Sequence, residues 1–254
     1  MKAPAMRLSD ERQQARQRAH FDDFADDYAA EAAAFDVHSE SLFQCFVAFA
    51  DPPPKGRLLE MGAGVGRYTI PLLRLGYAVD AVDLSPVALD RLSARARAEG
   101  LDGRLSTMVG DAARLHIEPV YDVVYSIHLL HHVPDPVRML AAMRGATRPG
   151  GTVACLEPNP VNPAWYPYIT FNPLRSWAVE YRMLREFPWQ LSRTYRQAGF
   201  ARIERRFYGI VPIPLVNRFP RLLHAETALN RLPALRFAGA VQIMKGTGET
   251  TPPA

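Results

Sequence analysis

The sequence predicts an α/β protein built on a mostly parallel sheet, and three observations lead to this fold class. Short apolar runs alternate with helical patterns from residue 57 to residue 158, as strands joined by crossover helices do. A glycine-rich turn, GAGVG, follows the first run directly. The later runs also end in polar segments, at Asp83, Asp111, 126–132 and 157–159. Because the carboxyl ends of parallel strands meet at one edge, we expect these segments to converge on one crevice.

Each element of this core has its own signal. Apolar runs predict strands, and apolar residues three and four positions apart predict helices. Ser85 is expected to cap one helix, with Pro86 in its first turn and Gly100 just past its end. The expected strands are 57–61, 77–83, 103–111, 121–128 and 152–158, and the expected helices are 67–76, 85–100 and 134–147.

The flanking segments differ from this core. A helix is expected from Ser9 to about Ala34, and the stiff segment DPPPKG precedes the first strand. Beyond residue 158 the chain is rich in proline and aromatic residues, and we expect helices at 178–187 and 191–200 and strands at 201–210 and 236–246. The predicted organisation is a helical lid over 1–50, a core over 51–158, a cap over 159–190, a return to the sheet over 191–246 with an insertion at 211–235, and a disordered tail over 247–254.

The composition narrows the function classes. Of the 254 residues, 48% are hydrophobic and 22% are charged, as in soluble globular proteins. The sequence shows no apolar leader and no run of the ~20 apolar residues that a membrane span needs, so we expect a cytoplasmic protein without stable membrane insertion. Two cysteines are too few for a disulfide framework or a zinc cluster. The basic residues are scattered rather than gathered in a stripe, so we expect no nucleic-acid partner.

The glycine-rich turn indicates a backbone that passes close to a ligand. A dinucleotide-binding turn would follow the pattern G-x-G-x-x-G, but Arg67 stands where its last glycine belongs. Glu60 enters the turn as a carboxylate, which would repel a pyrophosphate and tolerate a cationic ligand. Asp83 follows the next strand and suits recognition of ribose hydroxyls by either kind of cofactor. A nicotinamide-dependent oxidoreductase and a tight turn without ligand therefore stay open as alternatives.

Five segments in this order resemble the class I S-adenosylmethionine-dependent methyltransferases of the small-molecule type. They are LLEMGAGVGRYT, AVDLS, VGDAARL, YDVVYSIHLLHHVPDP and RPGGTVACLEPN. The resemblance implies a Rossmann-like, seven-stranded, mostly parallel sheet whose last strand is antiparallel, with helical and aromatic cap segments. It also implies S-adenosylmethionine as cofactor and a role in small-molecule metabolism, such as the biosynthesis of secondary metabolites. A member that binds the cofactor without catalysing a reaction is the remaining alternative.

The resemblance assigns a role to each cofactor-binding residue. The backbone of the turn would approach the methionine and ribose portions, and Glu60 would organise the turn. Asp83 would accept hydrogen bonds from the ribose hydroxyls, and Leu84 would pack on adenine. The implied set is Glu60, Gly62, Ala63, Gly64, Gly66, Asp83, Leu84, Asp111, Ala112, Ser126, Ile127 and Tyr28.

The remaining members of this set complete the site. Asp111 would accept a hydrogen bond from the adenine amino group, and the backbone of Ala112 would donate one to the ring. The carbonyl of Ser126 or Ile127 would hold the methionine ammonium group. Tyr28, in a segment that resembles the family's lid helix, would close over the cofactor or simply pack there.

Methyl transfer to a hydroxyl needs a group that removes its proton. The histidines of the segment SIHLLHH are the candidates, with His131 as first choice and His128 as second, although a purely structural role stays open. His128 with His131 or His132 has metal-binding spacing. We expect no metal, because many members of the family that the chain resembles carry a similar histidine-rich turn without one.

The acceptor is expected to be a small, apolar or aromatic organic metabolite, with methylation of oxygen favoured over that of nitrogen or carbon. The segment after the fourth strand lacks the Asn/Asp-Pro-Pro-Tyr/Phe motif of enzymes that methylate amines of bases or amides of glutamine. The acceptor wall is assigned to the aromatic residues of the cap, although these could equally be buried against the sheet. An apolar surface of this kind also leaves open a contact with a membrane lipid or with a second subunit in a homodimer. The assigned residues are Trp165, Tyr166, Tyr168 and Phe171.

Overall fold

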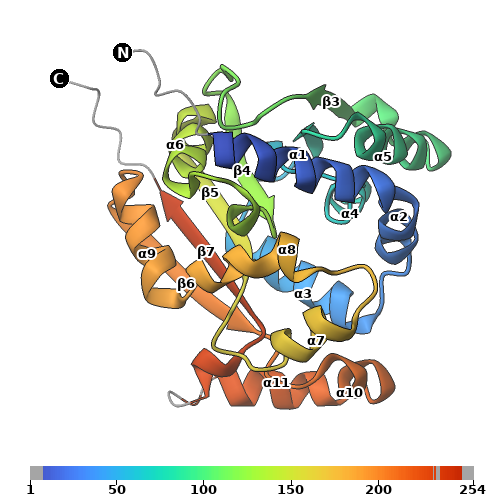
Figure 1. The fold of residues 1–254 in the computed structure, drawn as a ribbon, viewed down its shortest axis with the longest axis vertical. Coiled ribbons are helices and arrows are strands. Elements are labelled where there is room, and N and C mark those ends of the chain that lie inside the picture. Colours follow the sequence, from blue (N-terminus) through green and yellow to red (C-terminus); the bar gives the residue numbers. More distant parts are fainter. Residues whose placement is uncertain (1–7, 231, 233–234, 248–254) are drawn as a thin grey trace.

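The computed structural model describes residues 8–230, 232 and 235–247 and contains one seven-stranded sheet (Figure 1). The strands lie in the order β3-β2-β1-β4-β5-β7-β6, and β7 runs antiparallel to both of its neighbours. This confirms the predicted α/β class with an antiparallel last strand. The strands are β1 (Arg57–Met61), β2 (Ala78–Asp83), β3 (Leu105–Val109), β4 (Tyr121–Ile127), β5 (Thr147–Pro158), β6 (Arg202–Tyr208) and β7 (Val241–Thr247).

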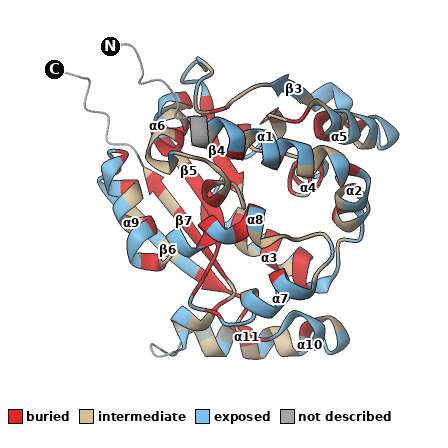
Figure 2. Cartoon of the chain, in the orientation of Figure 1, coloured by how far each residue is buried: buried red, intermediate tan, exposed pale blue. Residues whose placement is uncertain are grey.

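Helices cover both faces of this sheet because successive strand residues point to opposite faces and both sets are apolar. Leu58 and Val123 pack with α3 (Val37–Ala50), α4 (Thr69–Arg74) and α5 (Pro86–Ala98) on one face. Leu59 and Val124 pack with α6 (Pro136–Ala146) and α9 (Pro188–Gln197) on the other. Figure 2 shows the result: the strands are mostly buried, and the outer sides of the helices are exposed.

Several boundaries differ from those expected. The N-terminal helix is divided into α1 (Leu8–Asp23) and α2 (Ala25–Ala33) at Phe24, whose backbone is not helical. The segment after it forms α3, which packs on the sheet rather than belonging only to a lid. The RPGG turn expected before β5 lies inside this strand, at an irregularity in its pairing with β4. The expected last strand begins five residues later, at Val241, after a short 3-10 turn.

The two cap segments form short helices around one end of the sheet. The first contains α7 (Trp165–Phe171) and α8 (Trp177–Glu180), and the insertion forms α10 (Ile213–Arg218) and α11 (Leu222–Asn230) at the bottom of Figure 1. None of the helices in the described ranges has the length and apolar character needed to cross a bilayer. The tail predicted from 247 lies outside the described residues, apart from Thr247 at the end of β7.

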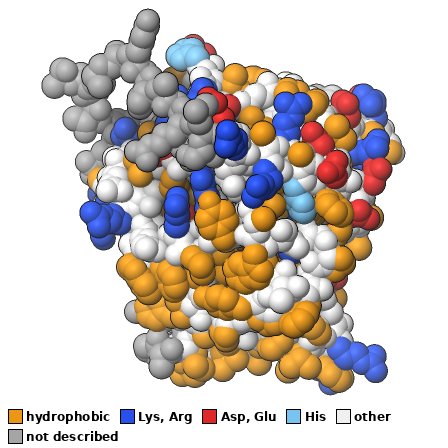
Figure 3. All heavy atoms as spheres, in the orientation of Figure 1, with side chains coloured by type: hydrophobic (Ala, Val, Ile, Leu, Met, Phe, Trp, Pro, Cys, Tyr) orange, Lys and Arg blue, Asp and Glu red, His pale blue; other side chains and the backbone are white. Residues whose placement is uncertain are grey.

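Apolar side chains gather on the lower part of the face shown in Figure 3, over α7, α10 and α11. Among those that are exposed are Phe171, Ile213, Leu215 and Phe219. Single exposed apolar residues are common on proteins, but a contiguous group of them indicates a contact surface.

Candidate functional site

A cavity of about 970 Å³ lies at the carboxyl ends of β1, β2 and β4, between the sheet and the two caps. This is where ligands bind in open α/β sheets. The predicted polar segments do converge here. Of the residues assigned from sequence, the cavity is lined by Tyr28, Glu60, Gly62, Ala63, Gly64, Asp83, Leu84, Asp111, Ala112, Ile127, His128, His131, Trp165 and Tyr168.

Four assigned residues lie outside this lining. The Gly66 backbone has φ +80°, and a Cβ there would lie 2.3 Å from Leu92 Cδ1, so this glycine lets the turn pack against α5. Ser126 is fully buried within β4. Tyr166 and Phe171 point outward from α7, and Phe171 is 82% exposed. A seven-residue helix can direct one face into the cavity, and α7 directs Trp165 and Tyr168 there.

The turn after β1 places backbone amides at the cavity. Gly62 has φ +77° and donates from its N–H to the Val82 carbonyl at 2.8 Å. A Cβ on Gly62 would lie 2.6 Å from Leu129, whereas a Cβ on Gly64 would meet no described atom within 4 Å. Gly64 therefore borders open cavity, and Gly62 and Gly66 are needed for packing.

Two carboxylates after β2 and β3 are held by backbone amides. Asp83 accepts hydrogen bonds from the N–H groups of Gly64 at 2.7 Å and Ser85 at 2.9 Å, and burial raises its pKa above the usual value. Asp111 accepts from the N–H of Ala113 at 3.0 Å and pairs with Arg114 at 3.2 Å. Each carboxylate oxygen can accept more than one hydrogen bond, so both groups can still bind a polar ligand.

Glu60 is a buried acid at the base of the turn. It accepts a hydrogen bond from Tyr125 Oη at 2.9 Å and another from the hydroxyl of Thr69. Burial raises the pKa of Glu60 to about 8, so the carboxyl group is largely protonated at neutral pH. These contacts join β1 to β4 and α4, which fits the expected role of organising the turn.

His131 is held between two carboxylates. Its Nδ1 lies 2.6 Å from Glu157 Oε2, and its Nε2 lies 3.2 Å from Glu180 Oε2. Burial alone would lower the pKa of His131, but the charges and hydrogen bonds of Glu157 and Glu180 outweigh it and raise the pKa to about 10. Both ring nitrogens are engaged and the ring is protonated, so His131 is not the general base that its position in the sequence suggested.

His128 has the opposite electrostatic environment. Burial and the neighbouring charge of His131 hold its pKa well below the ordinary value for histidine, so the ring is neutral. Its backbone is left-handed, with φ +53°, and its N–H donates to the Leu156 carbonyl at 2.7 Å. The ring faces the cavity and packs edge-on against Trp165, with ring centroids 5.9 Å apart. His128 is therefore the neutral imidazole available to a ligand.

A set of polar contacts joins the N-terminal helices to the α7–α8 cap and was missed in the sequence. Tyr28 Oη donates to the Leu174 carbonyl at 2.7 Å, and the Arg175 guanidinium lies 5.0 Å from the Tyr28 ring centroid. Glu31 pairs with Arg175 at 3.5 Å and with Arg67 at 2.9 Å. These partners are far apart in the chain, and no local pattern indicated them.

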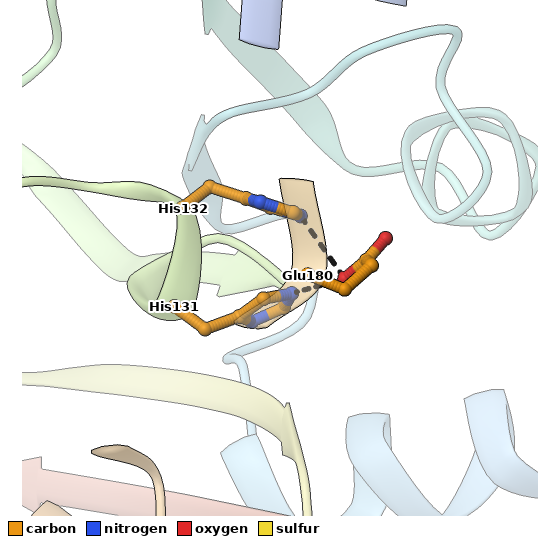
Figure 4. A group of neighbouring side chains, drawn as sticks. All are labelled: His131, His132 and Glu180. Atoms are coloured by element: carbon orange, nitrogen blue, oxygen red, sulfur yellow. Dashed lines mark hydrogen bonds and ion pairs between the residues drawn. The ribbon is translucent and has the colours of Figure 1, made fainter. Parts of the chain in front are cut away.

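Glu180 is the other residue that sequence reasoning missed. It lies at the end of α8, a four-residue helix, and comes within 3.9 Å of His132 Nε2 and 3.2 Å of His131 Nε2 (Figure 4). Spacing along the chain had suggested pairing His128 with one of these two histidines. The structure instead brings the consecutive pair, His131 and His132, together with an acid 48 residues further on.

Comparisons with known proteins agree with this fold. A family model described as a methyltransferase domain matches residues 59–155. The ubiquinone biosynthesis O-methyltransferase of Burkholderia pseudomallei is 29% identical over 202 residues, which cover 72% of this chain and 79% of that protein.

Two solved structures share the fold. A Thermotoga maritima S-adenosylmethionine-dependent methyltransferase has a TM-score of 0.59 at 17% identity, covering 92% of this chain and 100% of that one. Phosphoethanolamine N-methyltransferase 2 of Haemonchus contortus, in complex with S-adenosyl-L-methionine, has a TM-score of 0.58 at 19% identity. That match covers 83% of this chain and 53% of that one, so the present chain spans about half of the Haemonchus enzyme. The sheet order, the domain match over residues 59–155 and the aligned relative together support a class I S-adenosylmethionine-dependent methyltransferase.

Proposed function

We propose that the chain transfers the methyl group of S-adenosylmethionine to a hydroxyl group of a small, largely apolar organic molecule. The observation that carries the cofactor site is the juxtaposition of the 62–64 turn with Asp83 and Asp111 at one cavity. Gly64 gives the cofactor room beside the backbone, and Asp83 can accept from ribose hydroxyls. Asp111, at the end of the neighbouring strand, can accept from the adenine amino group.

The shape of the cavity supports a second ligand beside the cofactor. Its volume of about 970 Å³ is near the upper end of the ~300–1,000 Å³ typical of small-molecule sites. The part of its wall beyond His128 is apolar and comes from α7 and the 211–213 segment. Lining residues in this part include Trp165, Tyr168, Ile169, Val211 and Ile213.

An oxygen acceptor is supported by two observations. The relative with the longest alignment described above is named for O-methylation in ubiquinone biosynthesis. His128 is a neutral imidazole at the junction of the turn and the apolar wall, so it can accept a hydrogen bond from a hydroxyl group. As the C–S bond breaks and the new C–O bond forms, the hydroxyl proton would pass to His128 and the sulfonium would become a neutral thioether.

The proposal is tested by methyl transfer from radiolabelled S-adenosylmethionine to matched phenols and anilines with and without an apolar tail. We expect label in the phenols, with the tailed phenol having the lower KM. The substitution His128→Asn keeps a residue that tolerates left-handed backbone, and it should lower kcat by about 100-fold or more. The exposed His116→Asn should leave kcat unchanged. Label in the anilines alone, or an unchanged kcat in His128→Asn, would overturn the oxygen-acceptor assignment.

A cytoplasmic location and a homodimer through the face in Figure 3 stay predictions. Analytical ultracentrifugation across a concentration series measures the second of these directly.

A further inference from the structure

Three potential metal ligands meet at the wall of the cavity. His131 and His132 belong to the 3-10 helix η2 (Leu130–His132), and Glu180 ends α8. One ligand atom from each of the three residues lies within 4.8 Å of the other two, and Glu180 Oε2 lies 3.2 Å from His131 Nε2 and 3.9 Å from His132 Nε2. Figure 4 shows both rings turned towards Glu180.

These separations are close to those of a coordinated ion. Zinc binds imidazole nitrogen and carboxylate oxygen at ~2.0–2.2 Å, which puts neighbouring tetrahedral ligands roughly 3.3–3.6 Å apart. The separations of 3.2 Å and 3.9 Å from Glu180 Oε2 to the two nitrogens lie on either side of this range. Two imidazoles and one carboxylate are also a ligand set that first-row divalent ions favour over calcium or magnesium.

The outer contacts of both rings match those of metal-binding histidines, which usually give their second nitrogen to a fixed acceptor. His131 Nδ1 lies 2.6 Å from Glu157 Oε2, while the other oxygen of Glu157 accepts from the N–H groups of Leu129 and Leu130. His132 Nδ1 lies 3.4 Å from the side-chain amide of Gln17. A half-turn of that amide presents its oxygen to a protonated Nδ1. Each ring is therefore held with Nε2 towards Glu180.

The three residues also line the cavity, so a small molecule bound in the cavity could contact the ion. Three protein ligands with one position left to a small molecule is the arrangement of catalytic rather than structural zinc sites. We propose that His131, His132 and Glu180 bind one divalent first-row metal ion, whose remaining coordination position faces the acceptor. The ion would replace the proton that joins His131 and Glu180.

The role of this ion rests on the proposed function. An acceptor hydroxyl bound to the ion would be more acidic, as metal-bound water is. Its proton could then pass to His128, whose ring centroid lies 6.2 Å from that of His131. The ion would make the hydroxyl acidic enough to give its proton to the weakly basic imidazole of His128. It would also favour acceptors that offer an oxygen atom as a ligand.

The test uses full-length protein without a histidine tag, treated with a chelator, dialysed and titrated with Co²⁺ and Zn²⁺. We expect one equivalent of Co²⁺ to give visible absorption bands of low-symmetry coordination, and Zn²⁺ to displace it. Glu180→Gln and His132→Ala should lose this binding, and the exposed His116→Ala should keep it. Absence of saturable binding, or binding that survives in both site variants, would overturn the proposal.

Two further measurements test the geometry of the metal site and separate the metal proposal from the proposed methyltransferase function. Gln17→Leu removes an outer contact without removing a ligand, and we expect metal affinity to fall by about 10–100-fold; an unchanged affinity contradicts the assigned geometry. Calorimetry with S-adenosylhomocysteine is then run on the chelated protein. Binding of the nucleoside without any metal binding refutes the ion and leaves the methyltransferase function intact. Metal binding without nucleoside binding supports the ion and refutes the methyltransferase function. Circular dichroism confirms that each variant is folded.

Discussion

Gly64 differs from the neighbouring glycines because its missing side chain faces the cavity rather than packed protein. Its φ of +51° makes an alanine there cost ~1–2 kcal/mol of stability. If the cofactor lies along this turn, the added methyl group would also meet the cofactor. We expect Gly64→Ala to weaken S-adenosylhomocysteine binding at least tenfold, measured by calorimetry.

The matched control is Gly100→Ala. Gly100 has φ +67°, and a Cβ added there would have none of the described atoms within 4 Å. It lies past the end of α5 and is not part of the cavity lining. It should lose similar stability in urea unfolding while keeping nucleoside affinity. Equal affinity losses in both variants would show that strain, and not contact with the cofactor, is responsible.

Glu60 makes stability depend on pH. Its folded pKa of about 8 lies above the ordinary value of 4.5, so between these values the unfolded chain loses the proton and the folded chain keeps it. The folded state is therefore destabilised as pH rises through this window. Glu60→Gln keeps an acceptor for Tyr125 but cannot ionise. We expect the fall in unfolding free energy from pH 5 to pH 8 to shrink by a few kcal/mol.

The measurement is urea unfolding at several pH values, with Glu11→Gln, at an exposed position, as control. A pH dependence identical in the wild type and in Glu60→Gln would contradict the assigned pKa.

Residue-level prediction from sequence worked where the signal was local. Asp83 is the last residue of β2, Asp111 stands two residues after β3, and both line the cavity. The chemistry of His131 was out of reach, because it depends on Glu157, 26 residues away, and Glu180, 49 residues away. Only the fold reveals that these carboxylates fix the proton on His131, and that burial and the charge of His131 lower the pKa of His128.

At the scale of elements, α3 shows how the caps are attached to the core. Asp36 caps α3 by accepting from the Ser39 N–H at 2.8 Å, and it also accepts from Asn217 Nδ2 of α10 at 2.7 Å. Burial would raise the pKa of Asp36, but these hydrogen bonds outweigh it and lower the pKa. Its stabilising effect is thus present above its ordinary pKa of 3.8 and is lost as pH falls below it.

We expect Asp36→Ala to cost about 1 kcal/mol at pH 7, and the cost to disappear in acid. Asp36→Asn, which can still cap the helix, should lose less. Denaturant unfolding at pH 7 and at the acid end of the stable range measures both. A cost for Asp36→Ala that is undiminished in acid would contradict the assigned role of the carboxylate.

The strands were the most predictable elements, because a strand buried on both faces is a continuous run of apolar residues, which is easily distinguished from the polar turns around it. β1 covers the predicted 57–61. The caps were predicted less well: α7, α8 and α10 are short, and they are placed by contacts with other elements, such as that of α10 with α3, rather than by their own periodicity. The irregular start of β5 was missed because RPGG has the composition of a turn.

At the scale of the molecule, the cavity lies between the sheet and the segments that cover it, and a few polar contacts join two of these segments. The Tyr28–Leu174 hydrogen bond and the Arg175–Glu31 pair cross from the N-terminal helices to the α7–α8 cap. A ligand that fills the cavity contacts sheet and caps together. Ligand binding should therefore stabilise the whole fold cooperatively.

This leads to a prediction about thermal unfolding. A ligand at 100 times its Kd adds ~2.7 kcal/mol to the stability of a protein that binds it only when folded. For a chain of this size, each kcal/mol corresponds to ~2–4 °C, so S-adenosylhomocysteine should raise Tm by about 5–10 °C. NADH should raise it by much less, because Arg67 stands where a dinucleotide-binding turn has its last glycine. Gly64→Ala should reduce the shift at the same nucleoside concentration. An equal shift with NADH would favour the oxidoreductase alternative, since stabilisation follows whichever ligand the folded cavity binds.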